Sequence, residues 1–254
     1  MPTRRLLTLI FDSLMGAFAC ASNSKYQGLD ATGVFLLAQE EMADEDYGDA
    51  AESLDRLLLV YPNFEDGGEA NFLLANAYFL DEQYITAASE YTRFLDRYPG
   101  HPRAPEAALG VCRAYSELSP ISQRDQTFTD QALAVCRNVV ADYPTLPVAQ
   151  EAAQLSNEMR GKLARKIYEN GDFYLRRGLN DSAIIYFEDV VNNYPESEFA
   201  PDALLGIIEA YQRIGYEDEV QQARDRLLTD YPDSEAARSL GGATTGGDVS
   251  GVGS

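Results

Sequence analysis

The 254-residue sequence contains one histidine, three cysteines and no tryptophan. Zinc sites and Ser-His-Asp triads need several converging side chains, and one histidine cannot build either of them here. His101 stands between Gly100 and Pro102, so we interpret it as a turn residue. The sequence also shows no glycine-rich phosphate loop, no nucleophile elbow and no paired-carboxylate motif. We therefore expect no enzyme, no cofactor and no metal site.

Positive charge is scarce as well. Lys and Arg number 20 against 41 Asp and Glu, which gives a formal net charge of −21. A protein gains affinity for nucleic acid by neutralising phosphates with Lys and Arg, so this composition disfavours nucleic-acid binding. It also disfavours adhesion of the folded part to an anionic lipid surface. The simplest interpretation of the charge is a soluble, solvated surface.

The amino-terminal end differs from the rest of the chain. Arg4 and Arg5 precede a short apolar run, which is followed by small residues and Cys20. This order is typical of a secretory signal, and the run is too short for a comfortable transmembrane helix. We therefore predict that residues 1–19 form a signal peptide.

Two cleavage sites compete at the end of this signal. Cys20 after a small residue resembles a bacterial lipobox, in which the Cys becomes the lipidated first residue, whereas Ala17-Phe18-Ala19 fits an ordinary signal peptidase. The polar segment after Cys20 favours lipidation, with residues 20–30 as a tether. Asp12 inside the apolar run and Ala17 at the usual Leu position depart from the lipobox pattern.

The dipeptide Tyr-Pro organises the remainder of the chain. It occurs at Tyr61-Pro62, Tyr98-Pro99, Tyr143-Pro144, Tyr194-Pro195 and Tyr231-Pro232. Two apolar residues precede each Tyr by four and three positions: Leu57/Leu58, Phe94/Leu95, Val139/Val140, Val190/Val191 and Leu227/Leu228. Such a set forms one buried helical stripe, and Pro cannot continue the helix because it lacks an N–H and clashes with the preceding turn. Each Tyr-Pro therefore predicts the end of a helix.

The spacing of these dipeptides predicts a repeat. Successive copies are 37, 45, 51 and 37 residues apart, within the range of helical repeat proteins. The third unit carries its extra residues in the loop around Ser119–Gln126, and the fourth has its excess before the unit. Residues 148–176 contain no Pro, so we expect one long helix that enters the fourth repeat.

The second unit, about Gly68 to Pro99, carries a known pattern. Leu74-Ala75 is followed by Tyr78, Tyr84, Ala87 and Tyr91. This arrangement resembles the tetratricopeptide repeat. The sequence thus predicts an all-α tetratricopeptide-repeat solenoid of five helix-turn-helix repeats. Repeats one to three occupy residues 31–144, the long helix with repeats four and five occupies 145–240, and the Gly-rich tail, 241–254, is expected to be disordered.

Residues 25–240 together resemble the BamD family, lipoproteins of the bacterial outer-membrane β-barrel assembly machinery. The resemblance rests on the Tyr-Pro helix ends, the long helix, Cys20 and three short motifs: Ala104-Pro105-Glu106-Ala107, Arg124-Asp125-Gln126-Thr127 and Ala200-Pro201-Asp202-Ala203. It implies a periplasmic scaffold that is lipid-anchored to the inner face of the outer membrane. It also implies docking on the periplasmic domains of the barrel insertase BamA, with other assembly-machinery lipoproteins as partners. The amino-terminal repeats would receive the targeting signal of unfolded outer-membrane proteins. The imperfect lipobox and the Gly-rich tail depart from the family pattern.

The inner faces of the first helices provide a candidate peptide groove. Its residues are Phe35, Gln39, Met42, Phe72, Asn76, Phe79 and Leu80. Because both helices bury their Leu/Ala stripes elsewhere, these side chains would be extra apolar surface, which usually marks a binding site. The alternative is that another segment of the chain covers the aromatic residues and makes them part of the core.

The later repeats provide a candidate partner face of mixed charge. Its residues are Arg113, Arg165, Asp172, Arg176, Arg177, Glu209 and Arg213. Mixed charge suits a specific protein partner, and the resemblance implies insertase contacts in this half. The alternative is a solvated face with local ion pairs. The alternative for the whole chain is a different periplasmic tetratricopeptide adaptor, such as an envelope or division scaffold.

Two smaller expectations concern helix starts and cysteines. Ser197 and Ser234 are candidate N-caps after Pro turns. Cys112 and Cys136 fall on facing helices of one predicted repeat. In an oxidising compartment they could form a disulfide, and otherwise they would be small buried hydrophobic residues.

Overall fold

The computed structural model describes residues 25–242, which fold almost entirely into helices. The chain divides into two compact units, which meet between Ala114 and Tyr115. This boundary lies inside α6 (Ala104–Leu118) rather than after Pro144, where we expected the division between the two groups of repeats. The predicted signal peptide, Cys20 and the Gly-rich tail beyond Gly242 lie outside the described residues.

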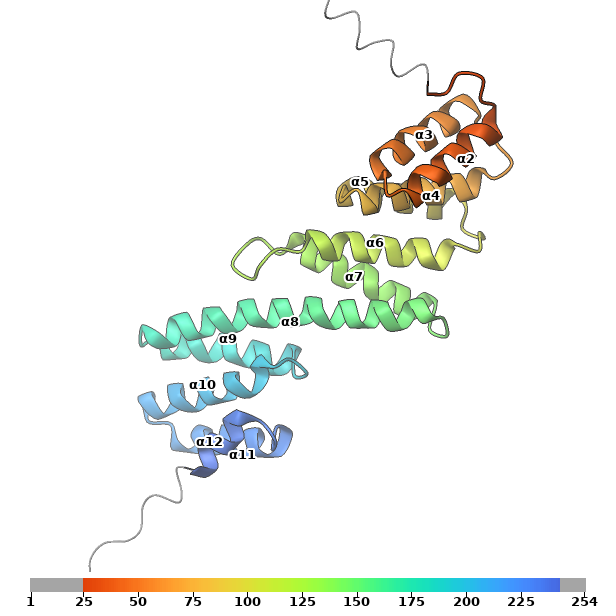
Figure 1. Cartoon of the computed structure of the whole chain (residues 1–254). Helices are drawn as coiled ribbons and strands as arrows, with labels where there is room; N and C mark the ends of the chain where they lie inside the picture. Colours follow the sequence, from red (N-terminus) through yellow and green to blue (C-terminus); the bar gives the residue numbers. More distant parts are fainter. Residues whose placement is uncertain (1–24, 243–254) are drawn as a thin grey trace, which may run out of the picture. The chain divides into compact units, whose positions relative to one another are not determined.

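The first unit consists of helical pairs joined by short turns. It contains α2 (Ala31–Ala43), α3 (Tyr47–Val60), α4 (Gly67–Leu80), α5 (Tyr84–Arg97) and most of α6. Each of α2 to α4 packs against the next helix in the chain (Figure 1).

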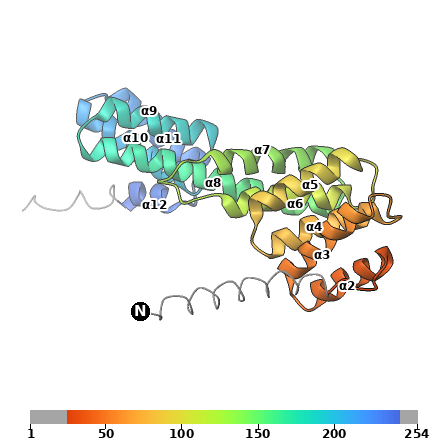
Figure 2. The ribbon, with the colours of Figure 1, turned by 90° about the horizontal axis from the view of Figure 1, so that it is seen from above.

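The second unit continues the same arrangement. It contains the end of α6, α7 (Thr127–Asp142), α8 (Pro147–Arg176), α9 (Asn180–Asn193), α10 (Phe199–Ile214), α11 (Glu217–Asp230) and α12 (Glu235–Gly242). The predicted long helix is confirmed as α8, with 30 residues. It packs on α7 through Met159 and Leu163, near its middle, and on α9 through Leu175, near its end (Figure 2). The predicted fold class, all-α with tetratricopeptide-type helical pairs, is confirmed.

The Tyr-Pro dipeptides end five helices, as predicted. In each copy the Tyr follows the last helical residue, and its backbone N–H donates to the carbonyl four residues earlier. These acceptors are Leu57, Phe94, Val139, Val190 and Leu227. All five acceptor residues are at most 1% exposed, so each helix end is fixed to the core. The Tyr backbone leaves the helical region, as expected for a residue that precedes Pro.

The observed helix starts agree less well with the sequence predictions than the helix ends do. Ser234 caps α12, because its Oγ accepts from the Ala237 N–H at 3.0 Å. The prediction for Ser197 is wrong. The turn in which the Ser197 N–H donates to the Tyr194 carbonyl delays α10 until Phe199, and the Ser197 hydroxyl makes no hydrogen bond.

The segment expected to be a tether is partly folded. Tyr26 is 6% exposed, and its hydroxyl lies 3.3 Å from Ser53 Oγ on α3. Lys25 forms an ion pair with Glu41 on α2, 2.7 Å from Oε1. Residues from Lys25 onward therefore pack on the first helical pair, and Asp30 then caps α2 by accepting from the Gly33 N–H.

Cys112 and Cys136 are both fully buried and disulfide-bonded. Both are therefore oxidised, so the alternative of two free, small buried residues is not the one observed. His101 occupies a turn, as predicted, and its ring lies edge-on to Phe94 at 5.3 Å. Among residues 25–242, no helix is both long enough and apolar enough to span a membrane.

One phenylalanine sets the distance between three helices in the second unit. Phe187 on α9 is 1% exposed and lies between Gly171 on α8 and Gly206 on α10. A Cβ at Gly171 would lie 2.7 Å from Phe187 Cδ1, and a Cβ at Gly206 would lie even closer to the ring. Only glycine lets the helix backbones approach the ring this closely.

We expect Gly206→Ala to destabilise the protein by about 1–3 kcal/mol, because the new methyl group has to displace Phe187 from its rotamer or move α10. Gly161→Ala is the matched control, since Gly161 is also inside a helix and a Cβ there would meet nothing within 4 Å. The control should gain about 0.5–1 kcal/mol from helix propensity. Urea unfolding of both variants measures the difference, and equal stabilities would contradict the packing argument.

The first unit contains a buried carboxylate between three helices. Glu90 on α5 is 8% exposed, and Arg93 donates a hydrogen bond to it. Nearby, the Tyr78 hydroxyl on α4 donates to Asp55 Oδ2 on α3 at 2.6 Å. Burial raises the pKa of Glu90, Arg93 partly opposes this, and the charge of Asp55 raises it further. Burial and the bond to Asp55 raise the pKa of Tyr78 to about 12.

We expect Glu90→Gln to raise the melting temperature at pH 7. A carboxyl whose folded pKa lies above its unfolded value binds its proton more tightly in the folded state. Stability therefore falls as pH rises from the ordinary Glu range through the folded pKa. Melting curves between pH 4 and pH 7 should show the gain of Glu90→Gln shrinking toward pH 4, and Glu65→Gln is the exposed control. A variant that is less stable at pH 7 would mean that the bond to Arg93 outweighs the cost of burial.

Candidate protein-binding surfaces

Two residues of the predicted peptide groove belong to the core instead. Phe35 is 8% exposed and its ring lies 5.3 Å from that of Phe64. Phe72 is 4% exposed and lies 5.7 Å from Phe94, under the guanidinium of Arg103. The predicted exposure of Phe35 and Phe72 is wrong, because aromatic residues from the following segment and the next helix cover them. For these two residues the alternative, that their own chain seals them, is the one observed.

The other groove residues remain at least partly accessible. Gln39 and Leu80 are exposed, while Met42, Asn76 and Phe79 are half-buried. Asn76 Oδ1 accepts the hydroxyl proton of Tyr91, and the Phe79 ring lies edge-on to Tyr84 at 5.4 Å. What remains of the groove is a smaller surface on the last two turns of α2 and α4. We call Gln39, Met42, Asn76, Phe79 and Leu80 the α2/α4 surface.

The structure brings together the ends of α8 and α10 in the second unit. Arg213 on α10 donates to the carbonyl of Leu175 at 2.6 Å and forms an ion pair with Glu209 at 2.5 Å. On α8, Arg176 pairs with Asp172 at 2.6 Å. Arg213 therefore satisfies one of the carbonyls that the end of α8 leaves free. Its role is to fix the position of α8 against α10 as well as to present charge.

Aromatic side chains lie beside Arg177, the next arginine after Arg176. Arg177 lies 3.5 Å from the ring centroid of Phe173, which is 44% exposed and edge-on to Tyr174. Tyr174 in turn stacks on Tyr186 of α9 at 5.3 Å with an interplanar angle of 10°. We call Phe173, Tyr174, Arg176, Arg177, Leu179 and Tyr186 the α8/α9 corner.

Sequence reasoning identified the arginines of this corner but not its apolar residues. Leu179 is 50% exposed in the turn after α8. Phe173 and Arg177 stand four residues apart, and this spacing places an arginine over an aromatic ring on the same helix face. That spacing could have revealed the pair in the sequence.

Two residues predicted for the partner face lie elsewhere. Arg165 is in the middle of α8, where it pairs with Glu169 at 2.9 Å beside the loop that follows α6. Arg113 is exposed on α6 and belongs to the first unit. The seven predicted residues therefore do not form one continuous face in the second unit.

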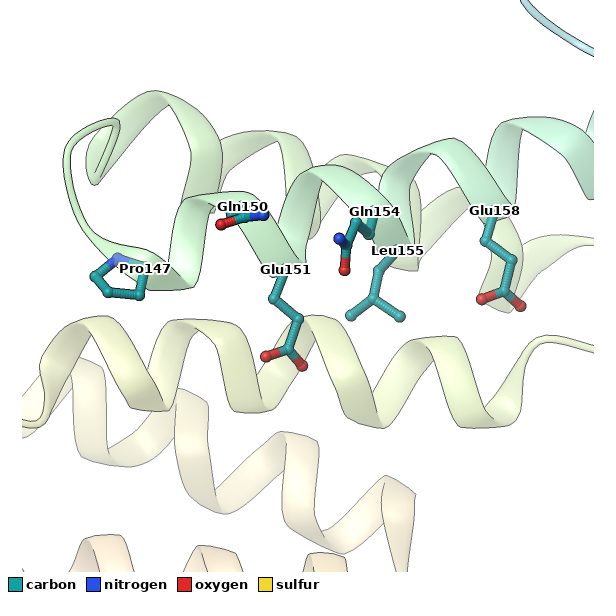
Figure 3. A pocket seen from close by; sticks show the side chains of 6 residues that line it. All are labelled: Pro147, Gln150, Glu151, Gln154, Leu155 and Glu158. Carbon is teal, nitrogen blue, oxygen red and sulfur yellow. The ribbon is translucent and has the colours of Figure 1, made fainter.

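A pocket of about 570 Å³ runs along the first half of α8 and contains none of the predicted site residues. Glu151, Leu155 and Glu158 point to the same side of the helix there, and Pro147, Gln150 and Gln154 complete the lining (Figure 3). The lining contains no serine, threonine, cysteine, lysine or histidine. Among the described residues there is no group of three or more His, Cys, Asp or Glu side chains that could hold a metal ion.

The family described as "YfiO: Outer membrane lipoprotein" matches this chain over residues 29–227, which is most of its length. The chain belongs to the YfiO family. The matched region includes α2 to α10 and most of α11, so it contains both the α2/α4 surface and the α8/α9 corner.

Curated relatives of this YfiO-family chain are named "Outer membrane protein assembly factor BamD". The protein from Caulobacter vibrioides is 34% identical over 109 residues, which cover 43% of this chain and 36% of the relative. The protein from Vibrio cholerae is 29% identical over 104 residues, covering 41% of this chain and 43% of the relative. The chain thus spans less than half the length of these relatives.

Solved structures similar to this YfiO-family chain are tetratricopeptide-repeat proteins and related helical arrays. The TPR2AB domain of yeast Sti1 in its pHSP90 complex is 11% identical, with coverage of 82% of this chain and 80% of that chain and a TM-score of 0.40. The MamA protein is 16% identical, with coverage of 87% and 98% and a TM-score of 0.36. Similarity this low bears on neither function nor partners.

Proposed function

We propose that this protein is a non-catalytic adaptor in outer membrane protein assembly, held at the periplasmic face of the outer membrane. Membership of the YfiO family and the shared name of the BamD relatives support this role. The proposal includes a lipid anchor at Cys20. The observation that carries it is the α8/α9 corner, where one exposed aromatic side chain, two half-buried ones and two arginines are held in place by contacts within the unit.

The composition of the corner is that of a protein interface. Aromatic residues and Arg are enriched at interface centres and account for most hot spots. Arg177 over Phe173 orders both side chains before a partner arrives, which lowers the entropy cost of binding. The bond from Arg213 to the Leu175 carbonyl fixes the helix end that presents them. The proposed partner is the periplasmic part of the barrel insertase BamA, together with other assembly lipoproteins.

We expect the double variant Arg176→Glu/Arg177→Glu to lose retention of BamA periplasmic domains in a pull-down, with affinity reduced about tenfold or more. The matched control is Arg137→Glu/Arg224→Glu, which makes the same charge change on α7 and α11 of the same unit. Phe173→Ala should weaken retention without changing net charge. Two outcomes would show that the corner is not the binding site. In one, the corner variants retain the BamA domains as the wild type does, and in the other, Arg137→Glu/Arg224→Glu loses retention equally.

The same proposal assigns the targeting signal of unfolded outer-membrane proteins to the α2/α4 surface. The amide of Gln39 is exposed and can pair with an extended peptide backbone, and Leu80, 45% exposed, with Phe79 offers an apolar contact beside it. The burial of Phe35 and Phe72 restricts this surface to the ends of the two helices.

We expect a photoreactive amino acid at Leu80 to crosslink a peptide that corresponds to the carboxyl terminus of a barrel protein. The same group at Ile85, 61% exposed on α5 of the same unit, is the control and should give a yield several-fold lower. Phe79→Ala should reduce the yield at Leu80. Equal yields at both positions would show that the contact is not specific to the α2/α4 surface.

A further inference from the structure

The loop between α6 and α7 is ordered around one buried amide. The Gln126 side chain is 6% exposed, and its Nε2 donates to the carbonyls of Ile121 and Arg124, each at 3.0 Å. Its Oε1 accepts from the Thr129 hydroxyl at 2.7 Å. The loop therefore closes on itself through Gln126, and its shape is fixed from within.

The same loop is fastened to the middle of α8. Ser122 Oγ and Gln123 Nε2 both donate to Glu169 Oε2 at 2.9 Å. In the other direction, Lys166 Nζ donates to the carbonyl of Arg124 at 2.8 Å. These contacts join residues more than 40 positions apart in the chain, so the loop and α8 form one surface.

An isoleucine projects from this fixed loop. Ile121 is 66% exposed, although the polar groups around it are bonded to α8 or to Gln126. Beside it is a pocket of about 280 Å³, lined by residues 119–123 of the loop and by Lys162 and Arg165 of α8. Holding an apolar side chain out of the core in an ordered loop costs hydrophobic stabilisation, which a partner that covers it would restore.

The charge of this part of α8 is unlike that of the chain as a whole. Residues 159–168 contain Arg160, Lys162, Arg165 and Lys166 and no acidic residue, in a protein where Asp and Glu outnumber Lys and Arg by 41 to 20. Lys162 and Lys166 are two of the three lysines in the sequence. The pairs Lys162–Glu158 and Arg165–Glu169 are local and partly exposed. Such pairs are worth at most about 1 kcal/mol, so an incoming carboxylate can compete with them.

We propose that the α6–α7 loop and the middle of α8 form a docking surface for an extended acidic peptide segment of a partner protein. An aliphatic side chain of that segment contacts Ile121, and its carboxylates lie at Lys162 and Arg165. An anionic lipid headgroup offers the same charge, but the net charge of −21 opposes approach to an anionic bilayer, which favours a peptide. The site goes beyond the proposed function and shares no residue with the α8/α9 corner or the α2/α4 surface.

The test is fluorescence anisotropy with the full chain and a fluorescein-labelled octapeptide of alternating Asp and Leu. The same peptide with Asn in place of Asp is the neutral control. The acidic peptide should bind and the neutral one should not, with affinity falling as salt is raised. Lys162→Gln/Arg165→Gln should weaken binding about tenfold or more. Ile121→Ser should weaken it several-fold.

Matched variants separate this site from general effects of charge and apolar surface. Arg137→Gln/Arg224→Gln removes the same two charges elsewhere in the unit, and Ile185→Ser changes an isoleucine that is also 66% exposed. Both should bind like the wild type. Equal binding of the two peptides, no effect of the site variants, or equal losses in the controls would overturn the proposal. Binding to phosphatidylglycerol vesicles without binding to the acidic peptide would also overturn it.

Circular dichroism establishes whether each variant is folded. If Lys162→Gln/Arg165→Gln is not folded, the result for Ile121→Ser decides the outcome. A chain that retains BamA domains but does not bind the acidic peptide contradicts this proposal alone. A chain that binds the acidic peptide but does not retain BamA domains contradicts the proposed function alone.

Discussion

The backbone constraint at each Tyr-Pro dipeptide determines where every second helix ends. Because the Tyr N–H closes the last turn and the following Pro has no N–H to give, the helix cannot extend further. Four of these helices, α3, α5, α9 and α11, have 14 residues, and α7 has 16. The last two Tyr-Pro corners also bind each other directly, since the Tyr231 hydroxyl donates to the Pro195 carbonyl at 2.9 Å. Similar helix lengths let each pair present a similar face to the next.

Close packing then decides which side chains are left for binding. Glycine and alanine at the contacts let neighbouring helices approach, and large rings such as Phe187 fill the remaining space. The same demand for filled volume draws Phe35 and Phe72 into the core of the first unit. Many of the accessible apolar side chains remain at helix ends and in loops, which is where the α8/α9 corner and Ile121 are found. Binding in this protein is accordingly expected at turns rather than along a deep apolar groove.

Electrostatics distinguishes these accessible places from the rest of the surface. A net charge of −21 keeps the protein soluble and repels it from other acidic surfaces in general. Against that background the arginines at the end of α8 and the cations in its middle stand out locally. These residues belong to the 30-residue helix α8 and its C-cap, but their surroundings differ. Arg177 lies over an aromatic ring, whereas Lys162 and Arg165 lie beside the α6–α7 loop.

The sequence by itself determined the helix ends, the repeat spacing, the long helix α8 and the place of the α6–α7 insertion. These features depend on local chemistry: the missing N–H of Pro, the spacing of apolar residues and the absence of Pro from residues 148–176. It also identified the arginines at the end of α8, because charged residues in the last turn of a helix are visible in a single segment.

Tertiary structure alone decided which aromatic residues are exposed and which residues share a surface. Phe72 is buried because Phe94 and Arg103 lie over it, and both come from other segments of the chain. Arg165 lies beside the α6–α7 loop because that loop, more than 40 residues earlier in the sequence, packs on α8 and binds Glu169. Burial and proximity depend on contacts between segments that are distant in sequence. The spacing of residues within one helix does not predict such contacts.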